Sequence, residues 1–276
     1  LVENSLDAGA TVIYVKLEDF GYDKIEVRDN GHGIGESDLP HVVLPHYTSK
    51  ISTFEDIQAL ETYGFRGQGL AAIAAVSRVT ITSSLRNKIG HSFTFDQQGK
   101  VVAQKQLPWE GTSVTIDRLF KNIPVRRKCL CTSKNKSLDL KKVERLLSAL
   151  GIAWPGVRLF LFHNKSLLWS RYPCQSFREA VGQVFGMSML GNMEYVDEND
   201  SKNEITIKAF LPKPEDRVRE LSSCDMDRMF LLVNRRHVLS KDLCEIIQKK
   251  YAEAVTVQTK RYPACAVTIS VPPQDV

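Results

Sequence analysis

Long apolar runs are absent from the 276-residue sequence, and no stretch approaches the roughly 20 residues that a membrane-spanning helix needs. We therefore expect no membrane as a partner. Cysteine is sparse: six residues are scattered along the chain, and only Cys129 and Cys131 stand close together. Without a second pair at metal-ligand spacing, this pattern excludes a zinc site and a disulfide framework, and it predicts reduced thiols in a cytosolic or nuclear protein.

Two common phosphate-binding patterns are also absent. A P-loop requires G-x-x-x-x-G-K-[ST], but Gly99-Lys100 is followed by Val101. The dinucleotide fingerprint G-x-G-x-x-G would begin at Gly31 and would need its third glycine where Glu36 stands. These departures exclude a P-loop NTPase and a dinucleotide-binding Rossmann domain.

The composition that is present is that of an ordinary globular protein, with 43% hydrophobic and 25% charged residues. The net charge of +5 allows an anionic partner without requiring one. The hydrophobic periodicity predicts a first helix that ends at Gly9, a long helix over residues 136–154 and a hairpin around Asn164. The alternation of helices and strands starts again after Pro173, which predicts two α+β domains, and Ser240 is the expected cap of a late helix.

Five short segments carry the candidate chemistry. Taken singly, most have an ordinary explanation, because Asp-Asn-Gly is above all a turn signal and an asparagine on a helix is usually only solvated. A glycine-rich segment that leads into a helix is a stronger sign, since free N–H groups at a helix start bind phosphate. The segments are Asn4 with Asp7, residues 29–33, residues 48–50, residues 64–70, and Gly111-Thr112.

Together and in this order, the segments resemble the GHKL ATPases, the fold shared by gyrase, Hsp90, histidine kinases and MutL. The stretches LVENSLDAGAT, VRDNGHGI, TSKI, YGFRGQGL and GTSVTIDRLFKNIPVRRK are similar to those of the MutL mismatch-repair family. HYTSKI, TYGFRG, RLFKNIPVRRK and the HNK hairpin most resemble its eukaryotic post-meiotic-segregation (PMS) branch. The resemblance covers essentially the whole chain. It implies an α+β protein: a GHKL (Bergerat) ATPase α/β sandwich over residues 1–173, then a ribosomal-protein-S5-like α/β domain over residues 174–276.

The resemblance implies ATP and Mg²⁺ as cofactors and assigns a role to each segment. Asn4 would give Mg²⁺ an amide oxygen, and Asp29 would accept the amine of adenine. Gly31 and Gly33 would let the backbone approach the base, and Thr112 would support the pocket from the sheet. Residues 48–50 would belong to a lid of roughly residues 35–70, and residues 66–70 would wrap the triphosphate. The expected nucleotide-binding residues are Asn4, Asp7, Ala8, Asp29, Gly31, Gly33, Thr48, Ser49, Lys50, Arg66, Gly67, Gln68, Gly69, Leu70 and Thr112.

The resemblance also implies that two groups of phosphoryl transfer fall outside the sequence. The general-base glutamate would stand one helical turn before Asn4, directly before Leu1, because residues four apart share a helix face. Glu3 cannot replace it, since it points about 100° away from Asn4 on an ideal helix. The lysine that reaches the γ-phosphate would follow Val276. We therefore expect a chain truncated at both ends, without a catalytic residue of its own and almost inactive in hydrolysis.

One motif departs from the family. The usual F-R-G-E-A-L is here Phe65-Arg66-Gly67-Gln68-Gly69-Leu70, which removes a negative charge near the phosphates. Gly69 also weakens the first helical turn by about 1 kcal/mol relative to alanine. An alternative therefore stays open: a weak or inactive MutL paralogue that acts as a nucleotide- or DNA-binding scaffold in a heterodimer. Another GHKL class, such as a type II topoisomerase, is a weaker alternative.

Basic residues point to DNA as a further partner. Arg126, Arg127 and Lys128 begin a stretch with few opposing carboxylates, and the family commonly carries a DNA-contacting basic residue at the position of Lys241. Such residues are either a solvated face or sequence-independent phosphate contacts, and the absence of interleaved aromatic residues argues against base stacking. The resemblance further implies a MutL-homologue heterodimer partner, a MutS-type mismatch-recognition complex and a nuclear location.

Overall fold

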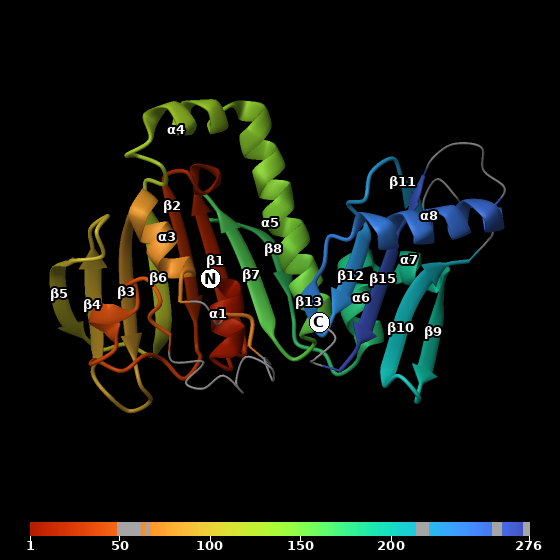
Figure 1. Ribbon diagram of the computed structural model, residues 1–276, viewed down its shortest axis with the longest axis horizontal. Helices are drawn as coiled ribbons and strands as arrows, with labels where there is room; N and C mark the ends of the chain where they lie inside the picture. Colours follow the sequence, from red (N-terminus) through yellow and green to blue (C-terminus); the bar gives the residue numbers. More distant parts are fainter. Residues whose placement is uncertain (49–61, 65–66, 214–220, 256–260, 273–276) are drawn as a thin grey trace. The chain divides into compact units, whose positions relative to one another are not determined.

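The computed structural model describes residues 1–48, 62–64, 67–213, 221–255 and 261–272 (Figure 1). It consists of two compact units. The first unit comprises residues 1–144 and 157–172, and the second unit comprises residues 145–156 and 173–276. Both combine helices with a β-sheet, so the expected α+β class is confirmed. No described helix is both long and apolar enough to cross a bilayer.

The first unit is built on an eight-stranded sheet with the order β5-β4-β3-β6-β2-β1-β7-β8. In this sheet β1 and β7 are parallel, and every other pair of neighbouring strands is antiparallel. The strands are β1 (Val12–Glu18), β2 (Lys24–Asp29), β3 (Arg78–Ser84), β4 (Gly90–Phe95), β5 (Val101–Leu107), β6 (Gly111–Asp117), β7 (Arg158–His163) and β8 (Ser166–Arg171).

Helices pack on one face of this sheet. The strands alternate accordingly: in β1, Ile13, Val15 and Leu17 are buried, whereas Lys16 between them is exposed. The helical segments of the first unit are α1 (Val2–Asp7), the short 3₁₀ turns η1 (Asp19–Gly21) and η2 (Leu39–His41), α3 (Gly69–Val76), α4 (Pro124–Leu130) and the first part of α5 (Ser133–Ala153). Figure 1 shows α1 and α3 in front of the sheet. The apolar residues between α3 and the strands, such as Ala74 and Ile81, form one core cluster.

Several local predictions for the first unit are confirmed. Gly9, with φ of +69°, follows α1 in the left-handed conformation that favours glycine. The hairpin between β7 and β8 turns through Asn164 and Lys165, both of which have positive φ. The long helix α5 begins at Ser133, three residues earlier than expected, because the Thr132 hydroxyl accepts the Asn135 N–H at 3.3 Å and so caps it.

The second unit contains a five-stranded sheet with the order β13-β12-β15-β10-β9, and a two-stranded pair β11-β14. Its strands are β9 (Met193–Asp200), β10 (Ile205–Pro212), β11 (Ser222–Ser223), β12 (Met229–Val233), β13 (Arg236–His237), β14 (Tyr262–Pro263) and β15 (Cys265–Ser270). Its helices are α6 (Phe177–Phe185), α7 (Met187–Gly191) and α8 (Lys241–Val255), together with the end of α5. The Ser240 hydroxyl accepts the Leu243 N–H at 3.3 Å, so the predicted cap of α8 is confirmed.

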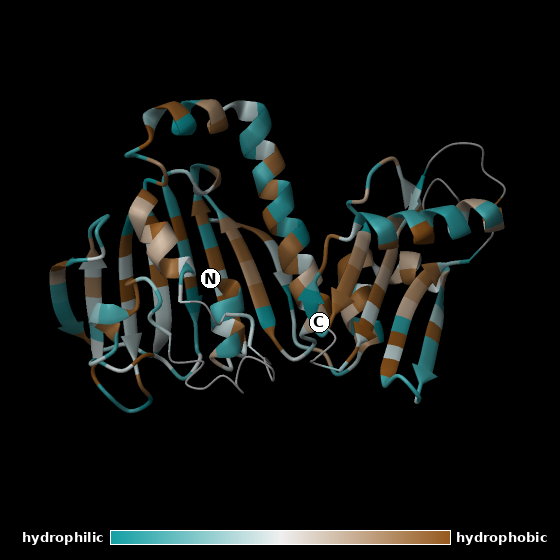
Figure 2. Ribbon diagram, in the orientation of Figure 1, coloured by the Kyte–Doolittle hydropathy of each residue, from teal (hydrophilic) through white to brown (hydrophobic). Residues whose placement is uncertain are grey.

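Both faces of the five-stranded sheet are apolar. Along β12, Phe230 and Leu232 join the cluster on the side of α6, whereas Met229 and Leu231 join the cluster that contains Cys244 of α8. Figure 2 accordingly colours β12 and β15 as largely hydrophobic. The sheet is therefore the central layer of this unit, with helices on both sides. All six cysteines of the chain are free.

Candidate nucleotide site and basic surface

The candidate nucleotide site centres on Asp29, the last residue of β2. Its side chain is only 7% exposed, and both carboxylate oxygens have donors. The Ser5 hydroxyl of α1 donates to Oδ2 at 2.7 Å, and the Gly31 N–H donates to Oδ1 at 2.9 Å. A carboxylate has about four acceptor sites, so it keeps room for a further donor. The two bonds fix the orientation of Asp29 and join α1 to the end of β2.

Beneath Asp29 lies a buried pair of hydroxyl groups. Thr112 of β6 stands opposite Asp29 in the strand register, and its Oγ1 lies 2.8 Å from Oγ of Ser83 in β3. Ser83 is completely buried and accepts the Ile34 N–H at 2.9 Å. Buried hydroxyls need such partners to offset the cost of leaving water. The floor of the site is therefore polar, fixed and shared by three strands.

Three glycines surround this floor because the backbone leaves no room for a side chain. A Cβ at Gly33, which has φ of +80°, would collide with the Ser84 carbonyl oxygen. One at Gly111, with φ of +74°, would collide with the Asp29 carbonyl oxygen. One at Gly31 would lie 2.8 Å from Cβ of Ala8. The protein's own packing therefore requires glycine at these positions, whether or not a ligand approaches them.

The end of α1 is tied to the glycine-rich segment. Asp7 accepts the Tyr63 N–H at 2.9 Å through Oδ1 and the Gly64 N–H at 3.1 Å through Oδ2. The Ala8 carbonyl accepts the His32 N–H at 3.0 Å. Asn4 lies on α1 next to Ser5 and is exposed. Asp7 and Ala8 thus make contacts within the protein, and Asn4 is exposed on the same helix.

The glycine-rich segment leads into α3 as the sequence indicates. Gly67 has φ of +59° and accepts the His46 N–H at 3.1 Å, and Gln68 is the N-cap residue of α3. The side chain of Gln68 does not cap the helix, so among the described residues the first N–H groups of α3 have no side-chain cap. Leu70 packs on the core cluster of α3, while Gly69 is exposed. Thr48 is described, but the predicted residues Ser49, Lys50 and Arg66 lie outside the described residues.

Two contributors to this site were not predicted from the sequence, namely Ser5 and Ser83. Ser5 is 24 positions from Asp29 in the chain, and Ser83 is 29 positions from Thr112. The packing of α1 against β2 brings Ser5 to Asp29, and the pairing of β3 with β6 brings Ser83 to Thr112. One signal was available for Ser83, since a polar residue at an inward position of the alternating strand RVTITSS needs a partner.

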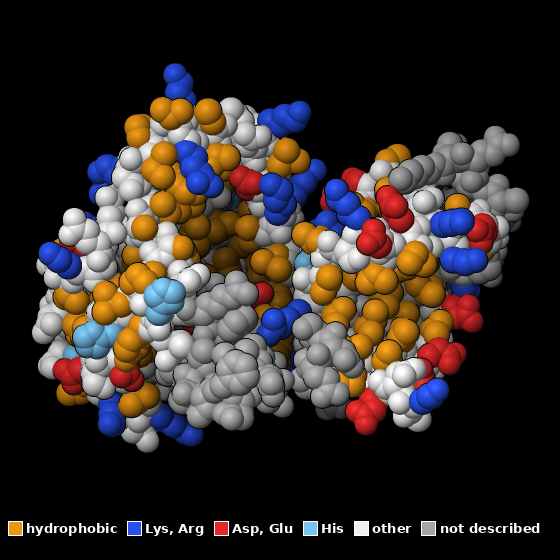
Figure 3. Space-filling view, viewed as in Figure 1, with side chains coloured by type: hydrophobic (Ala, Val, Ile, Leu, Met, Phe, Trp, Pro, Cys, Tyr) orange, Lys and Arg blue, Asp and Glu red, His pale blue; other side chains and the backbone are white. Residues whose placement is uncertain are grey.

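The basic residues predicted for DNA contact lie on α4 and at the start of α8. On α4, Arg126 and Lys128 are exposed, and the Arg126 guanidinium lies 4.4 Å from the Phe120 ring centre. Arg127 is half-buried and forms an ion pair of 2.8 Å with Asp23. Lys241 is exposed as the first residue of α8 in the second unit. Figure 3 shows Lys and Arg side chains around α4 and the start of α5.

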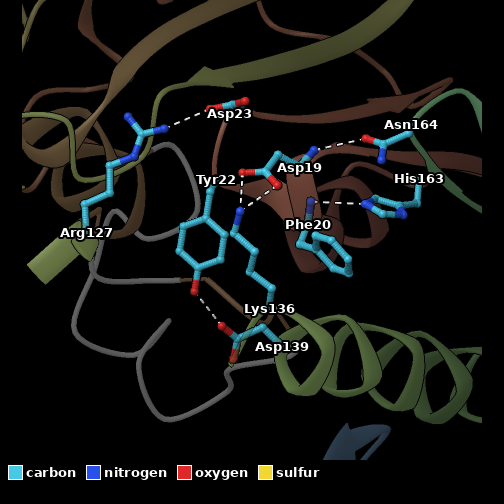
Figure 4. Close-up of polar contacts among 9 residues, drawn as sticks. All are labelled: Asp19, Phe20, Tyr22, Asp23, Arg127, Lys136, Asp139, His163 and Asn164. Carbon is cyan, nitrogen blue, oxygen red and sulfur yellow. Dashed lines mark hydrogen bonds and ion pairs between the residues drawn. The ribbon is translucent and has the colours of Figure 1, made fainter. Parts of the chain in front are cut away.

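A polar cluster anchors this basic segment to the turn after β1 (Figure 4). Lys136 of α5 contacts both carboxylate oxygens of Asp19 at 2.7 Å. The turn itself has φ of +46° at Asp19 and +59° at Phe20, and it is held from the β7–β8 hairpin. His163 Nε2 accepts the Phe20 N–H at 3.1 Å, and Asn164 accepts the Asp19 N–H at 3.0 Å.

The same cluster contains a partly buried hydroxyl–carboxylate bond. Tyr22 donates to Asp139 of α5 at 2.7 Å. Burial, followed by this hydrogen bond, raises the pKa of Tyr22 well above its usual value. Burial acts to raise the pKa of Asp139, but the bond from Tyr22 and the charge of Lys142 outweigh it and lower this pKa. Arg127, Lys136 and Asp139 are therefore structural anchors, and Arg126 and Lys128 are the accessible cations of the segment.

Comparison with known families gives two matches along the chain. Residues 1–119 match the family described as "Histidine kinase-, DNA gyrase B-, and HSP90-like ATPase". Residues 181–276 match the family described as "DNA mismatch repair protein, C-terminal domain". The first match contains Asp29, Thr112 and the start of α3, and the second contains Lys241.

Curated relatives belong to mismatch repair. The chain is 38% identical over 279 residues to "PMS1 protein homolog 1" of Homo sapiens, which covers 100% of this chain and 30% of the relative. It is 34% identical over 295 residues to "Mismatch repair endonuclease PMS2" of Homo sapiens, with coverages of 98% and 33%. It is 31% identical over 278 residues to "DNA mismatch repair protein MutL" of Myxococcus xanthus, with coverages of 100% and 43%. The chain thus spans less than half the length of these relatives.

Solved structures show the same fold. One, "Crystal Structure of N terminal domain of a DNA repair protein", has a TM-score of 0.81 at 24% identity and covers 99% of this chain and 81% of the other. Another, "Aquifex aeolicus MutL ATPase domain complexed with ADP", has a TM-score of 0.70 at 24% identity, with coverages of 99% and 89%. Both span the two units described above.

Proposed function

Because the chain belongs to the MutL/PMS family of DNA mismatch-repair proteins, of which it has the N-terminal GHKL ATPase region, we propose that it binds ATP with Mg²⁺ and responds with a change of conformation. The observation that carries this proposal is the fixed carboxylate of Asp29, which is 7% exposed and stands above the Ser83–Thr112 pair. Such a group in a polar, shielded floor suits recognition of one donor edge of a base.

Adenine fits this floor better than guanine. The Asp29 carboxylate accepts hydrogen bonds, and the Ser5 hydroxyl and Gly31 N–H leave acceptor capacity on its oxygens. The exocyclic amine of adenine is a donor, whereas guanine carries a carbonyl oxygen at the corresponding position and would be repelled. Thr112 and Ser83 complete the floor and can hold a bridging water.

The triphosphate would bind at the start of α3. The N–H groups after Gln68 lack a side-chain cap among the described residues, and a helix N-terminus attracts anions. Asn4 and the nucleotide would together provide the oxygen ligands that Mg²⁺ prefers. Asn4 carries a neutral amide oxygen on an exposed side chain, and the phosphates and water would supply the remaining ligands. The described residues contain no cluster of three or more His, Cys, Asp or Glu side chains that could hold a metal alone. The ion would therefore depend on the nucleotide.

Asp7 would couple nucleotide binding to the conformational change. Its carboxylate joins α1, which carries Asn4, to the backbone of Tyr63 and Gly64 directly before the glycine-rich segment. A nucleotide that contacts both Asn4 and α3 would therefore stabilise one arrangement of the intervening segment, which we propose as the lid. Lid closure would favour assembly with a MutL-homologue partner in a nuclear complex with a MutS-type protein. The accessible cations Arg126, Lys128 and Lys241 would add sequence-independent DNA contacts.

Calorimetric titration with a non-hydrolysable ATP analogue tests the proposal. Binding is measured without the hydrolytic step, so it tests the site directly. We expect Asp29→Asn to weaken binding by about 10- to 100-fold, the range for hydrogen bonds to charged groups. Asn4→Ala should reduce the affinity to that of the unsubstituted chain without Mg²⁺. Glu245→Gln, a neutralised exposed carboxylate on α8, is the matched control and should bind normally.

Two outcomes would contradict the proposal. Equal binding by Asp29→Asn and the unsubstituted chain would remove Asp29 from the site. Failure of the unsubstituted chain to bind would favour the second candidate, a scaffold that acts through DNA and partner contacts. The observation behind this candidate is Gln68-Gly69, which puts a neutral side chain and an exposed glycine where α3 begins.

A further inference from the structure

An open cleft of about 570 Å³ lies in the first unit, at the end of the sheet where the central strand β3 begins and its neighbour β6 ends. We call this end of the sheet, together with α4, the basic edge. Three cationic side chains line it: Arg78 from β3, and Arg118 and Lys121 from the segment after β6. The amides of Gln97 and Gln98 lie on the turn between β4 and β5 and also face the cleft. Each of these groups carries N–H donors, which is the chemistry that binds phosphate oxygens.

These cations differ from the other basic residues nearby. Arg127 and Lys136 are paired with Asp23 and Asp19 at 2.8 and 2.7 Å, so their charge is used within the protein. Arg78, Arg118 and Lys121 are exposed, and none of them forms an ion pair with a described residue. Their charge is therefore available to an external anion.

Two carboxylates also line the cleft, and each has a role in the backbone around it. Asp96 Oδ1 accepts the N–H groups of Gln98 at 2.8 Å and Lys100 at 2.9 Å, so it shapes the β4–β5 turn. Asp117 stands in register between Arg78 on one side and Lys24 on the other. With three cations and two carboxylates, the charge of the lining remains positive, and both Asp96 and Asp117 reduce it.

The segment that carries Arg118 and Lys121 is firmly held. The Arg118 N–H donates to the Asp23 carbonyl at 2.8 Å, and the Phe120 N–H donates to the Val76 carbonyl at 2.8 Å. Asn122 Nδ2 donates to the Ala75 carbonyl at 2.9 Å. Arg118 and Phe120 keep φ of +53° and +59°, a costly conformation for residues other than glycine that persists because these bonds impose it. The backbone that carries the two cations is thus held in place.

The cleft is continuous with the accessible cations of α4. Phe120, in the middle of the same segment, carries the Arg126 guanidinium 4.4 Å above its ring centre. Four residues later the chain enters α4, which Figure 1 shows at the upper edge of the sheet, above the ends of β2, β3 and β6. Arg126 therefore connects the cleft to the exposed face of α4.

We infer that this cleft binds a phosphate group of the DNA backbone and extends the α4 contact surface along the edge of the sheet. The inference rests on the DNA-binding part of the proposed function and assigns Arg78, Arg118 and Lys121 to it. Phosphate contacts carry no sequence information, so the cleft would add affinity and salt dependence without base preference.

The test measures binding of a short labelled DNA duplex as a function of salt. The variant Arg78→Gln/Arg118→Gln/Lys121→Gln should bind more weakly at low salt, and its slope of log K against log salt should fall by about 0.9 for each phosphate that the protein no longer neutralises. The matched control is Lys88→Gln/Lys105→Gln/Lys202→Gln, which removes the same charge at exposed positions outside the cleft. It should keep the slope of the unsubstituted chain. Asp117→Asn should strengthen binding, which a misfolded protein would not do.

The outcomes separate the inference from the proposed function. If both triple variants show the same loss of DNA affinity and of salt slope, binding depends only on the net charge of the protein, and the inference that the cleft is a phosphate site is wrong. If the unsubstituted chain binds but the cleft variant binds equally well, the inference fails and DNA contact through α4 stands. If the unsubstituted chain does not bind DNA at low salt, the DNA-binding part of the proposed function fails as well. Arg78→Lys/Arg118→Lys, which retains the charge, should restore most of the salt slope.

Discussion

The Asp29 site and the basic edge of the same unit are suited to bind ligands by different physical interactions. At Asp29 the polar groups are fixed at short range: Ser5 and Gly31 hold the buried carboxylate, and Ser83 and Thr112 hold each other beside it. At the edge, Arg126, Lys128 and Arg118 are exposed. Fixed buried groups discriminate by geometry and are little affected by salt, whereas exposed cations attract at long range and are screened. Substitutions in the two regions should therefore differ in kind as well as in size.

The largest effect should come from Gly33→Ala, which tests how rigid the Asp29 site is. A Cβ there would collide with the Ser84 carbonyl oxygen in a backbone with φ of +80°. We expect a loss of roughly 4 kcal/mol in the free energy of unfolding, at the high end for single substitutions, together with loss of nucleotide binding. Urea unfolding measures the first effect and calorimetry the second.

Gly69→Ala is the matched control for that substitution. A Cβ at Gly69 would meet nothing within 4 Å, and alanine favours a helix by about 1 kcal/mol over glycine. The control should therefore unfold at equal or higher urea concentration. Equal stability of the Gly33 and Gly69 variants would show that the site accommodates backbone shifts and would remove the contrast with the edge.

A smaller effect is expected for Ser5→Ala, which removes the donor to Asp29 Oδ2. Hydrogen bonds to charged groups contribute about 1.5 to 3 kcal/mol, and the carboxylate would remain buried. We expect a loss of stability of about 2 kcal/mol and weaker nucleotide binding, both nearly independent of salt. Ser201→Ala, in the exposed turn between β9 and β10, should change neither. A strong salt dependence of the Ser5→Ala effect would contradict the short-range character of the site.

The anchor between Tyr22 and Asp139 should show a pH dependence. The pKa of Asp139 is lower in the folded chain than its ordinary value, so its contribution to stability is present above the unfolded pKa of about 3.9. This contribution is lost as the pH falls through the lower folded value. Asp139→Asn should therefore lower the melting temperature at neutral pH, and the difference should shrink below about pH 4. A constant difference across the acid range would show that Asp139 does not titrate in this way.

The smallest effect should follow from Asp23→Asn, which releases Arg127 from its ion pair. Exposed ion pairs contribute at most about 1 kcal/mol, so the melting temperature should hardly change. The released guanidinium should raise DNA affinity a few-fold at low salt, and the gain should disappear at high salt because the contact is screened. Fluorescence anisotropy at two salt concentrations measures it. A gain that persists at high salt would mean that the edge does not act through long-range charge.

Local signals in the sequence predicted much of the fold. The glycine after α1, the hairpin around Asn164 and the cap at Ser240 are each encoded in a few neighbouring residues, and all three are confirmed. The short helix α4 was not predicted, although Pro124 at its first position is a start signal. The strand β9 was not predicted because MEYVDEND has little strand propensity. It forms because β10 pairs with it along its whole length.

The site was predictable only in part, and the reason is distance along the chain. Asp29 and Thr112 were expected from a resemblance, but Ser5 and Ser83 depend on partners 24 and 29 positions away, and no local pattern identifies those partners. The cleft escaped prediction in the same way, because Arg78 and Arg118 come together only where β3 pairs with β6. The roles expected for Ser49, Lys50 and Arg66 stay predictions, since these residues lie outside the described part of the chain.

The crowded glycines at positions 33 and 111 have a consequence at the level of the genetic code. Every single-nucleotide missense change of a glycine codon gives alanine, serine, cysteine, valine, aspartate, glutamate, arginine or tryptophan, and all of these carry a Cβ. At both positions that one atom already collides with a neighbouring carbonyl oxygen. No missense change of either codon therefore avoids this collision, whereas every missense change at Gly69 adds its Cβ to open space.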